Sequence, residues 1–485
     1  MIKKIVFFFF TLLAITSCDD DTFSTSPSHL LSFSADTIRF DTVFSSVPTP
    51  TKTFWVYNNN KEGLRCTSIS LEQGNQSGYR VNVQGVYLGQ ENGYNTTNVE
   101  VRQHDSTRIF IEATLPNNYK QVPTSVSDNI VFQLESGVQQ KVNLNAYAWD
   151  AEPIRHLVIS NDTVFSNTGK PRIIYGKITI NKGATLTITA GTTLYFHGDA
   201  GIDVYGRLVC EGEANDNVVL RGDRLDHMFD YLPYDRVSGQ WQGLHLYETS
   251  YGNVLRHTDI HSSFNGISID SADVSRSKLL LENSVVHNCQ GYGIQATNAS
   301  ITLSNCQLSN TLNDCLYVDG GAVNINGCTL AQFYPFDSNR GNALNVTAVN
   351  HPLSQLECSN SLITGYGEDE VMLNFNQDDE ERHFLFDHCL LRTPIVEGAD
   401  SVKMVAVEYE KTGEEDKDNK YGLHNFILVD AEHQIYDFRL NKDAAAIGVA
   451  NADTALPTDR LGRPRDGDPD AGCYEYVDNG DDKQQ

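Results

Sequence analysis

His257-Thr258-Asp259-Ile260 is the first of six similar four-residue segments that decide the fold of this chain. The other five are Asn283-Ser284-Val285-Val286, Asn305-Cys306-Gln307-Leu308, Gly327-Cys328-Thr329-Leu330, Asn360-Ser361-Leu362-Ile363 and His388-Cys389-Leu390-Leu391. Successive segments begin 26, 22, 22, 33 and 28 residues apart. The first position is always His, Asn or Gly, residue types that tolerate a left-handed backbone. The second position is always small, and the fourth is always branched and apolar.

Each segment predicts a bend followed by one short strand. Strand side chains alternate between two sides, so the second and fourth positions share one side, which we expect to be the interior. Units of 22 to 33 residues cannot bury a core singly, but they build one when stacked. We therefore predict an all-β protein whose main part is a right-handed parallel β-helix.

A second series of residue pairs supports the stacking. A small or apolar residue precedes an aliphatic one in Gly266-Ile267, Gly293-Ile294, Cys315-Leu316, Ala343-Leu344 and Val371-Met372. Their spacing follows that of the first series, so we expect a second column in the same coils. Only the end coils leave unpaired strand edges, and we expect the flanking segments of the chain to cover them.

The N-terminus has the features of a secretory signal. Lys3 and Lys4 precede an apolar run too short to span a bilayer, followed by Ile15-Thr16-Ser17-Cys18. This resembles a bacterial lipobox, which implies removal of residues 1–17 and a lipid on Cys18. The alternative is an ordinary signal followed by a chance cysteine. The Asp19-Asp20-Asp21 triplet resembles the surface-export signal of Bacteroidota lipoproteins, or it is simply a solvated part of an acidic tether over residues 18–29.

Charge and cysteine content exclude some classes of function. The net charge of −27 becomes −29 once Lys3 and Lys4 are removed, and so acidic a surface disfavours nucleic acid as a partner. Of ten cysteines, nine remain beside an acylated Cys18, and an odd number cannot all pair within one chain. Cys289, Cys306, Cys328 and Cys389 lie in or beside the repeat, and since no C-x-x-C spacing occurs we expect these four to be packed thiols rather than a metal site.

Residues 30–150 predict a different, smaller domain. Short alternating stretches such as 37–40, 53–57, 80–83, 108–111 and 142–146 are separated by turns rich in Asn, Gly and Ser. This pattern is typical of an antiparallel, Ig-like β-sandwich, which we interpret as a spacer. Phe54 and Trp55 must face opposite sides of their strand, and a core position for Trp55 is preferred over a sugar platform.

The β-helix is expected over residues 155–440. Its opening has short alternating strands with glycine corners, in Gly176-Lys-Ile178, Gly183-Ala-Thr-Leu186 and Gly191-Thr-Thr-Leu194. This opening, with Trp241-Gln242-Gly243-Leu244, resembles the first coils of pectin-lyase-like β-helix lipoproteins of Bacteroidota. The closing segment, residues 441–476, resembles the tail of these proteins in Asp459-Arg-Leu-Gly462-Arg463-Pro464-Arg465 and Asp470-Ala-Gly472-Cys473-Tyr474-Glu475, although Ala is usual where Cys473 stands. Residues 477–485 are expected to be a disordered acidic tail.

The longest excursions from the expected coils are Asp223–Gly239, Ala331–Gly341 and Gly365–His383, and the first carries the predicted ligand-binding residues. Aromatic rings beside carboxylates provide an apolar platform and hydrogen-bond acceptors for a neutral sugar. The candidates are Asp230, Tyr231, Tyr234, Asp235 and, just after the loop, Trp241. The alternative is that these rings only fold the loop onto the coil.

An enzyme would need two carboxylates facing each other, and the candidates are Asp259, Asp270 and Asp273. The motif series expected of polygalacturonase-like enzymes and the base and calcium cluster expected of pectate lyases do not occur in the sequence. His257, Asp259 and His261 alternate, but His257 belongs to the bend, and no metal site is predicted. Asp466-Gly-Asp468-Pro-Asp470 lacks the glycine and glutamate of a calcium loop, so it predicts a turn; structural calcium stays open and no other cofactor is expected.

The preferred function is that of a non-catalytic glycan-binding or adhesion module, lipid-anchored at the outer membrane and exposed at the cell surface. Its partners would be the membrane, through Cys18, and an extracellular glycan or other surface component. The alternative is a polysaccharide lyase or glycoside hydrolase that uses the strand face of the helix.

Overall fold

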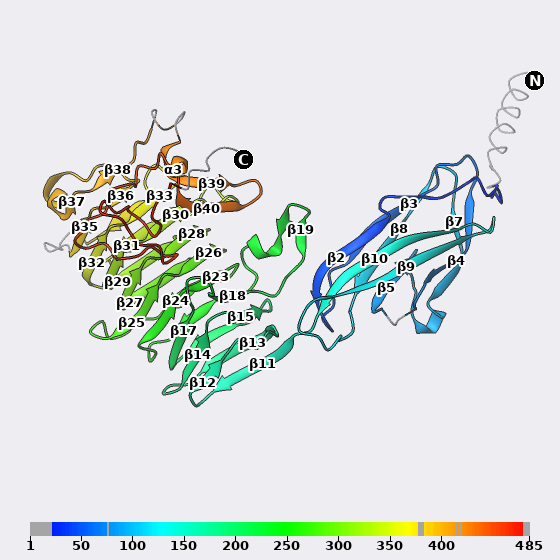
Figure 1. The fold of residues 1–485 in the computed structure, drawn as a ribbon, viewed down its shortest axis with the longest axis horizontal. Helices are drawn as coiled ribbons and strands as arrows, with labels where there is room; N and C mark the ends of the chain where they lie inside the picture. The colour runs from blue at the N-terminus through cyan, green and yellow to red at the C-terminus, as the bar shows by residue number, and fades with distance from the viewer. Residues whose placement is uncertain (1–21, 75–76, 377–382, 414–415, 417–419, 479–485) are drawn as a thin grey trace, which may run out of the picture. The chain divides into compact units, whose positions relative to one another are not determined.

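The computed structural model describes residues 22–74, 77–376, 383–413, 416 and 420–478. It divides into two compact units, Met1–Ala151 and Glu152–Gln485, and Figure 1 shows the strands of both. Cys18 and the Asp19–Asp21 triplet lie outside the described residues, as do residues 479–485 of the predicted tail.

The first unit is a sandwich of two five-stranded sheets. One sheet has the order β1 (Ser32–Phe33), β3 (Lys52–Tyr57), β8 (Ser106–Ala113), β5 (Tyr79–Val83) and β6 (Val86–Tyr87). The other has the order β2 (Thr37–Phe44), β10 (Gln139–Trp149), β9 (Thr124–Leu134), β4 (Leu64–Leu71) and β7 (Asn95–Val101). All five predicted stretches are strands, and the pairings are antiparallel except for β2 with β10.

Two expectations for this unit need correction. Phe54 is buried in the core, whereas the ring of Trp55 is 40% exposed on the outer face of β3, so the core position predicted for Trp55 is wrong. The predicted tether is not free throughout, because its residues 22–24 are bonded to the sandwich through Gly63. Phe23 forms a bridge to Gly63 and lies under the guanidinium group of Arg65.

The second unit coils through three parallel ladders of strands, here named sheets A, B and C. Sheet A holds β16 (Gly201–Val204), β21 (Leu244–Leu246), β24 (Ile267–Ile269), β31 (Leu344–Thr347) and β34 (Val371–Asn374). Sheet B holds β12 (Thr163–Phe165), β14 (Thr185–Thr189), β17 (Arg207–Glu211), β22 (Asn253–Arg256), β25 (Ser277–Glu282), β32 (Leu353–Ser359), β35 (Phe384–Asp387) and β37 (Met404–Val405).

Sheet C holds β15 (Thr193–Phe196), β18 (Val218–Gly222), β23 (Thr258–His261), β26 (Val285–Cys289), β28 (Gln307–Thr311), β30 (Thr329–Gln332), β33 (Leu362–Gly365), β36 (Leu390–Leu391) and β38 (Glu408–Tyr409). Longer strands serve two sheets: β11 (Glu152–Ile159) and β13 (Arg172–Ile180) run through C and A, and β27 (Ile294–Ser304) and β29 (Leu316–Asn326) through A and B. The unit is therefore a parallel β-helix, as predicted.

The six repeated segments form the predicted columns on sheet C. All six bend residues have positive φ, from 42° at His257 to 62° at Gly327. The aliphatic positions pair in register from coil to coil: Ile260, Val286, Leu308, Leu330, Ile363 and Leu391. The small residue at the second position is fully buried in every segment. Its side chain can accept a hydrogen bond from a backbone N–H group of the preceding coil, as Ser284 Oγ does from Thr258 N at 2.9 Å.

The second column on sheet A is correct except in its last member. Leu344 pairs with Val371 rather than with Met372, and Met372 is exposed. The small position of this coil is taken by Glu370, whose carboxylate accepts bonds from Ala343 N and Gly367 N. Burial raises the pKa of the Glu370 carboxyl to about 7.

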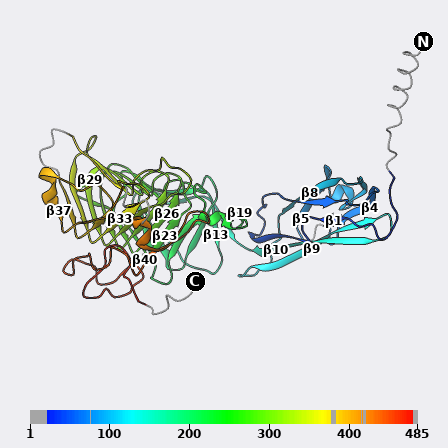
Figure 2. The ribbon, with the colours of Figure 1, turned by 90° about the horizontal axis from the view of Figure 1, so that it is seen from above.

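The helix ends earlier than predicted, at β38. Residues beyond it form a short helix, α3 (Tyr421–His424), and an antiparallel hairpin of β39 (Phe426–Asp430) and β40 (Ile435–Leu440). The hairpin and the closing segment pack on the outer face of sheet C, where Phe426, Phe438 and Cys473 meet Leu362 and Leu390. Figure 2 shows them along one side of the coils, so this segment covers a lateral face rather than an end.

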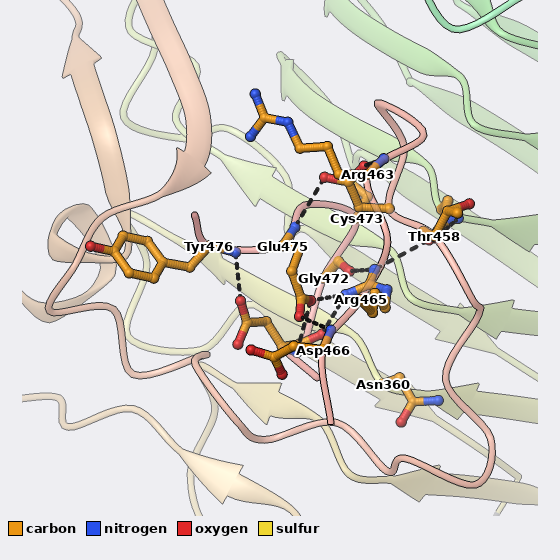
Figure 3. A network of polar contacts seen from close by, with 12 residues as sticks. Asn360, Thr458, Arg463, Arg465, Asp466, Gly472, Cys473, Glu475 and Tyr476 are labelled. Atoms are coloured by element: carbon orange, nitrogen blue, oxygen red, sulfur yellow. Dashed lines mark hydrogen bonds and ion pairs between the residues drawn. The ribbon is translucent and has the colours of Figure 1, made fainter. Parts of the chain in front are cut away.

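The closing segment is held by a buried ion pair, shown in Figure 3. Arg465 donates to Glu475 at 3.0 Å, to the carbonyls of Asp470 and Gly472, and to Asn305 of the bend column. Glu475 also accepts from the backbone N–H groups of Asp466 and Asp470. The predicted turn at 466–470 is thus fixed from within the segment.

All nine cysteines in the described part of the chain are buried free thiols, including Cys289, Cys306, Cys328 and Cys389, for which this was expected. Burial raises the pKa of most of these thiols, for example to about 12 at Cys66 and at Cys473. Eight of the nine belong to the second unit.

Candidate functional site

The long loop between β18 and β21 folds over sheet C. It contains a small hairpin, β19 (His227–Phe229) with β20 (Leu232–Pro233), and a 3-10 turn, η2 (Tyr234–Arg236). Its last residues are tied to the corner that follows β23, because Gly239 N donates to Ser263 O and Gln240 N to Ser262 O. The turn at η2 thereby brings Asp235 onto the outer face of β23.

A polar network joins this loop to three neighbouring strands of sheet C. His261 donates from Nδ1 to Asp259 and from Nε2 to Asp235, both at 2.8 Å. His287, which pairs with His261 in the next coil, donates from Nε2 to the same oxygen of Asp259 at 3.2 Å. Arg221 forms an ion pair with Asp235 at 2.8 Å. Two carboxylates from the sequence prediction, Asp235 and Asp259, are therefore joined through one imidazole.

The network is held in a charged state. Burial opposes the charge on His261, but Asp259 and Asp235 outweigh it and raise the pKa of this imidazole to about 9. Burial likewise opposes the charge on Asp259, yet His261 and His287 hold its pKa well below the ordinary range. The pKa of Asp235 is also lowered, by His261 and Arg221 against burial. The pairs neutralise one another, which fixes the loop on the sheet.

The predicted sugar platform is only partly present. Trp241 is fully buried: its ring stacks on Phe196 at 4.2 Å and its Nε1 donates to His261 O. The prediction that Trp241 offers its ring to a ligand is therefore wrong. The ring of Tyr234 is covered by the guanidinium group of Arg224 at 3.6 Å. Asp230 and Tyr231 are exposed near the tip of the loop, but Asp235 is engaged in the network.

The three candidate catalytic carboxylates have separate partners. Asp259 belongs to the network under the loop, whereas Asp270 lies beside sheet A and accepts a bond from His245 at 2.8 Å. Asp273 lies in an exposed turn and accepts bonds from the backbone and hydroxyl of Ser275. None of these described contacts brings two of the three together.

Sequence reasoning missed an aromatic hollow on the sandwich. A hollow of about 400 Å³ opens on the outer face of the β3–β8–β5–β6 sheet. It is lined by Thr51, Arg80, Val81, Asn82, Tyr87, Phe110 and Glu112. Thr53 pairs with Phe110, Phe110 with Asn82 and Asn82 with Tyr87, so these residues form one row across four strands. Tyr87 and Phe110 are each 40% exposed.

Trp55 extends this aromatic surface by one step. It pairs with Arg108, whose guanidinium group lies 5.6 Å from the Trp55 ring and 5.2 Å from the Phe110 ring. Polar groups border the rings, because Arg80 and Glu112 form an exposed ion pair at 3.0 Å and Thr51 donates to Glu112. The alternation of residues along each strand predicts which side chains share a face of the sheet. It does not tell which of the two faces is exposed, so the aromatic row could not be recognised from the sequence.

Residues 155–330 match the family model of the right handed beta helix region. The match begins within β11 and ends within β30, so it covers the β-helix from its first coils to beyond the polar network. No curated protein matches the chain. In the part of the chain that the structure describes, no helix has both the length and the apolar character needed to cross a membrane.

Solved structures resemble parts of this chain only weakly. The ASH/PapD-like domain 7 of human CEP192 is 11% identical, with a TM-score of 0.18, over 27% of this chain and 92% of that domain. A Porphyromonas gingivalis W83 protein of unknown function is 12% identical, with a TM-score of 0.19, over 29% of this chain and 60% of its own. A family 123 glycoside hydrolase from Clostridium perfringens is 8% identical, with a TM-score of 0.18, over 27% of this chain and 30% of that chain.

Proposed function

We propose that this is a cell-surface glycan-binding protein that takes its ligand on the outer face of the sandwich. The observation that carries the proposal is the hollow of about 400 Å³ between the half-open rings of Tyr87 and Phe110, with Trp55 close by. Exposed rings give a sugar the apolar surface that its C–H faces require.

The polar border of the hollow suits a hydroxylated ligand. Arg80 and Asn82 offer N–H donors, and Glu112 and Asn82 offer oxygen acceptors, all beside the aromatic row. A few convergent polar groups among apolar ones are the usual composition of a small-molecule site. The Arg80–Glu112 ion pair is 40% exposed at both side chains, so both groups stay accessible to a ligand, whereas under the loop Asp259 is 26% and His261 8% exposed.

Binding is tested on the soluble mature protein with Cys18→Ala, applied to a glycan array. For the glycans retained, Trp55→Ala and Phe110→Ala are each expected to weaken affinity about ten-fold, which is about 1.4 kcal/mol. Tyr119→Ala is the matched control, since its ring is 92% exposed elsewhere on the sandwich. A loss on Tyr231→Ala with none on Trp55→Ala would place the site on the loop of the helix instead. Product analysis of the retained glycans distinguishes binding from cleavage.

The proposal includes a lipid anchor at Cys18, supported by the apolar run and the Ile15-Thr16-Ser17 sequence before it. Cys18→Ala in the full chain is expected to move the protein from the membrane to the soluble fraction. Protease added to intact cells should digest the unsubstituted protein, because the Asp19–Asp21 triplet is taken to direct it to the surface. Protection in intact cells would contradict surface exposure while leaving the anchor in place.

A further inference from the structure

Three side chains on two neighbouring strands of sheet C offer ligand atoms to one point. Asp259 and His261 lie two residues apart on β23 and therefore project on the same side. His287 on β26 is the register partner of His261 in the next coil. One ligand atom of each residue lies within 4.8 Å of the others. We infer that Asp259, His261 and His287 form a binding site for a divalent transition-metal ion such as Zn²⁺.

The donor set selects the class of ion. Two imidazole nitrogens and one carboxylate oxygen suit zinc and its transition-metal neighbours, whereas Ca²⁺ and Mg²⁺ prefer oxygen ligands throughout. Asp259 Oδ1 lies 2.8 Å from His261 Nδ1 and 3.2 Å from His287 Nε2. The ion would take the place of the two protons that join this oxygen to the rings.

The groups behind these ligands have the arrangement found around bound metals. A histidine ligand commonly donates its second ring N–H to a carboxylate, which fixes the ring. Here the Nε2 of His261 donates to Asp235 at 2.8 Å, and Asp235 is held by Arg221. The loop therefore supplies an orienting carboxylate, although none of the three ligands belongs to it.

The site is open on one side. The side chain of His261 is 8% exposed, while those of Asp259 and His287 are 26% and 25% exposed. Three protein ligands with a solvent-facing side leave room for water as a fourth ligand. The site is distinct from the hollow on the sandwich, so it does not depend on the proposed glycan binding.

The test is a calorimetric titration of the chelator-treated soluble chain, carrying Cys18→Ala, with Zn²⁺ in the presence of millimolar Ca²⁺ and Mg²⁺. One equivalent of Zn²⁺ is expected to bind with a dissociation constant in the micromolar range or below. His287→Gln and Asp259→Asn are each expected to weaken this binding at least ten-fold. Asp235→Asn should weaken it ten- to hundred-fold without removing it.

His245→Gln is the matched control. His245 forms a similar pair with Asp270 on another face of the helix, but this pair lacks the second histidine that the inferred site has. It should bind Zn²⁺ as the parent does. Circular dichroism and melting of each variant separate lost binding from lost fold. Zn²⁺ binding that is equal in the parent, His287→Gln and Asp259→Asn would overturn the inference, as would the absence of any stoichiometric binding. Thiolate charge-transfer bands with Co²⁺ would also overturn it, since they would assign the metal to cysteine.

Discussion

Arg465→Ala is expected to release the closing segment from sheet C while the coils beneath it stay folded. Removing one partner of a buried ion pair leaves the other charge uncompensated, at a cost of about 3 to 5 kcal/mol. Here the side chains of Arg465 and Glu475 are each 4% exposed, and the arginine also anchors the bend column through Asn305. Local release costs less than global unfolding, so the segment should open first.

The thiol of Cys473 reports this opening. Its burial raises its pKa to about 12, which suppresses the reactive thiolate, and release would restore ordinary reactivity. In the soluble chain with Cys18→Ala, a thiol reagent should label Cys473 in the Arg465→Ala variant and no cysteine in the parent. The control is Arg439→Ala, which breaks an ion pair with Asp437 whose arginine is 42% exposed and should cost at most about 1 kcal/mol. Protected Cys473 in both variants would contradict the anchoring role.

Leu308→Asp is expected to unfold the second unit. Leu308 is fully buried between Val286 and Leu330 of the adjacent coils, so the substitution buries a charge with no partner. Losses above about 4 kcal/mol are typical of such a change and are a large part of the stability of a domain. Each coil depends on its neighbours, so the damage spreads along the stack.

The free cysteines again provide the measurement. Labelling in the native buffer should reach thiols of the second unit, whereas Cys66 in the sandwich core should stay protected. Leu385→Asp is the matched control, because Leu385 is 37% exposed on β35. Thiols as protected in Leu308→Asp as in the parent would contradict the assignment of Leu308 to the interior column.

The columns of sheet C could be predicted because their causes are local and repeated. Every coil needs a bend residue with positive φ and two inward residues, so the same pattern of residue types recurs six times in the sequence. The error at Met372 arose because Glu370 occupies a position that the four other coils of the predicted column give to glycine, alanine or cysteine. A buried carboxylate bonded to two backbone N–H groups has no signature in a pattern of small and apolar residues.

The side that a residue faces was harder to predict. Alternation requires Phe54 and Trp55 to differ, but it does not say which of them meets the opposite sheet. Trp241 is buried by Phe196, a contact between coils that follows only from register. The position of the closing segment is reflected in the sequence. The outward position that Asp259 occupies in its coil is occupied by the apolar residues Leu362 and Leu390 in the coils that the closing segment covers.

The proximity of the two histidines in the inferred metal site could also have been predicted from the sequence. His261 is the fourth residue after the bend at His257, and His287 is the fourth after the bend at Asn283. Aligned by their bends, the two rings fall into one outward column, as their pairing confirms. Asp235 was not predictable in this way, because its place depends on how the loop folds back over the strands.

The closing segment also gives the stack a mechanical polarity. It bonds to Asn305, Asn326, Thr329 and Asn360, which belong to three successive coils. A pull on the N-terminal end would peel the unstrapped coils first, one at a time. The register partners Ile178, Ile202, Leu244 and Ile267 lie 24, 42 and 23 residues apart, so each step would release about 75 to 150 Å of extended chain. Peeling should then stall where the strap begins, so that a stretched molecule lengthens in steps and keeps its last coils intact.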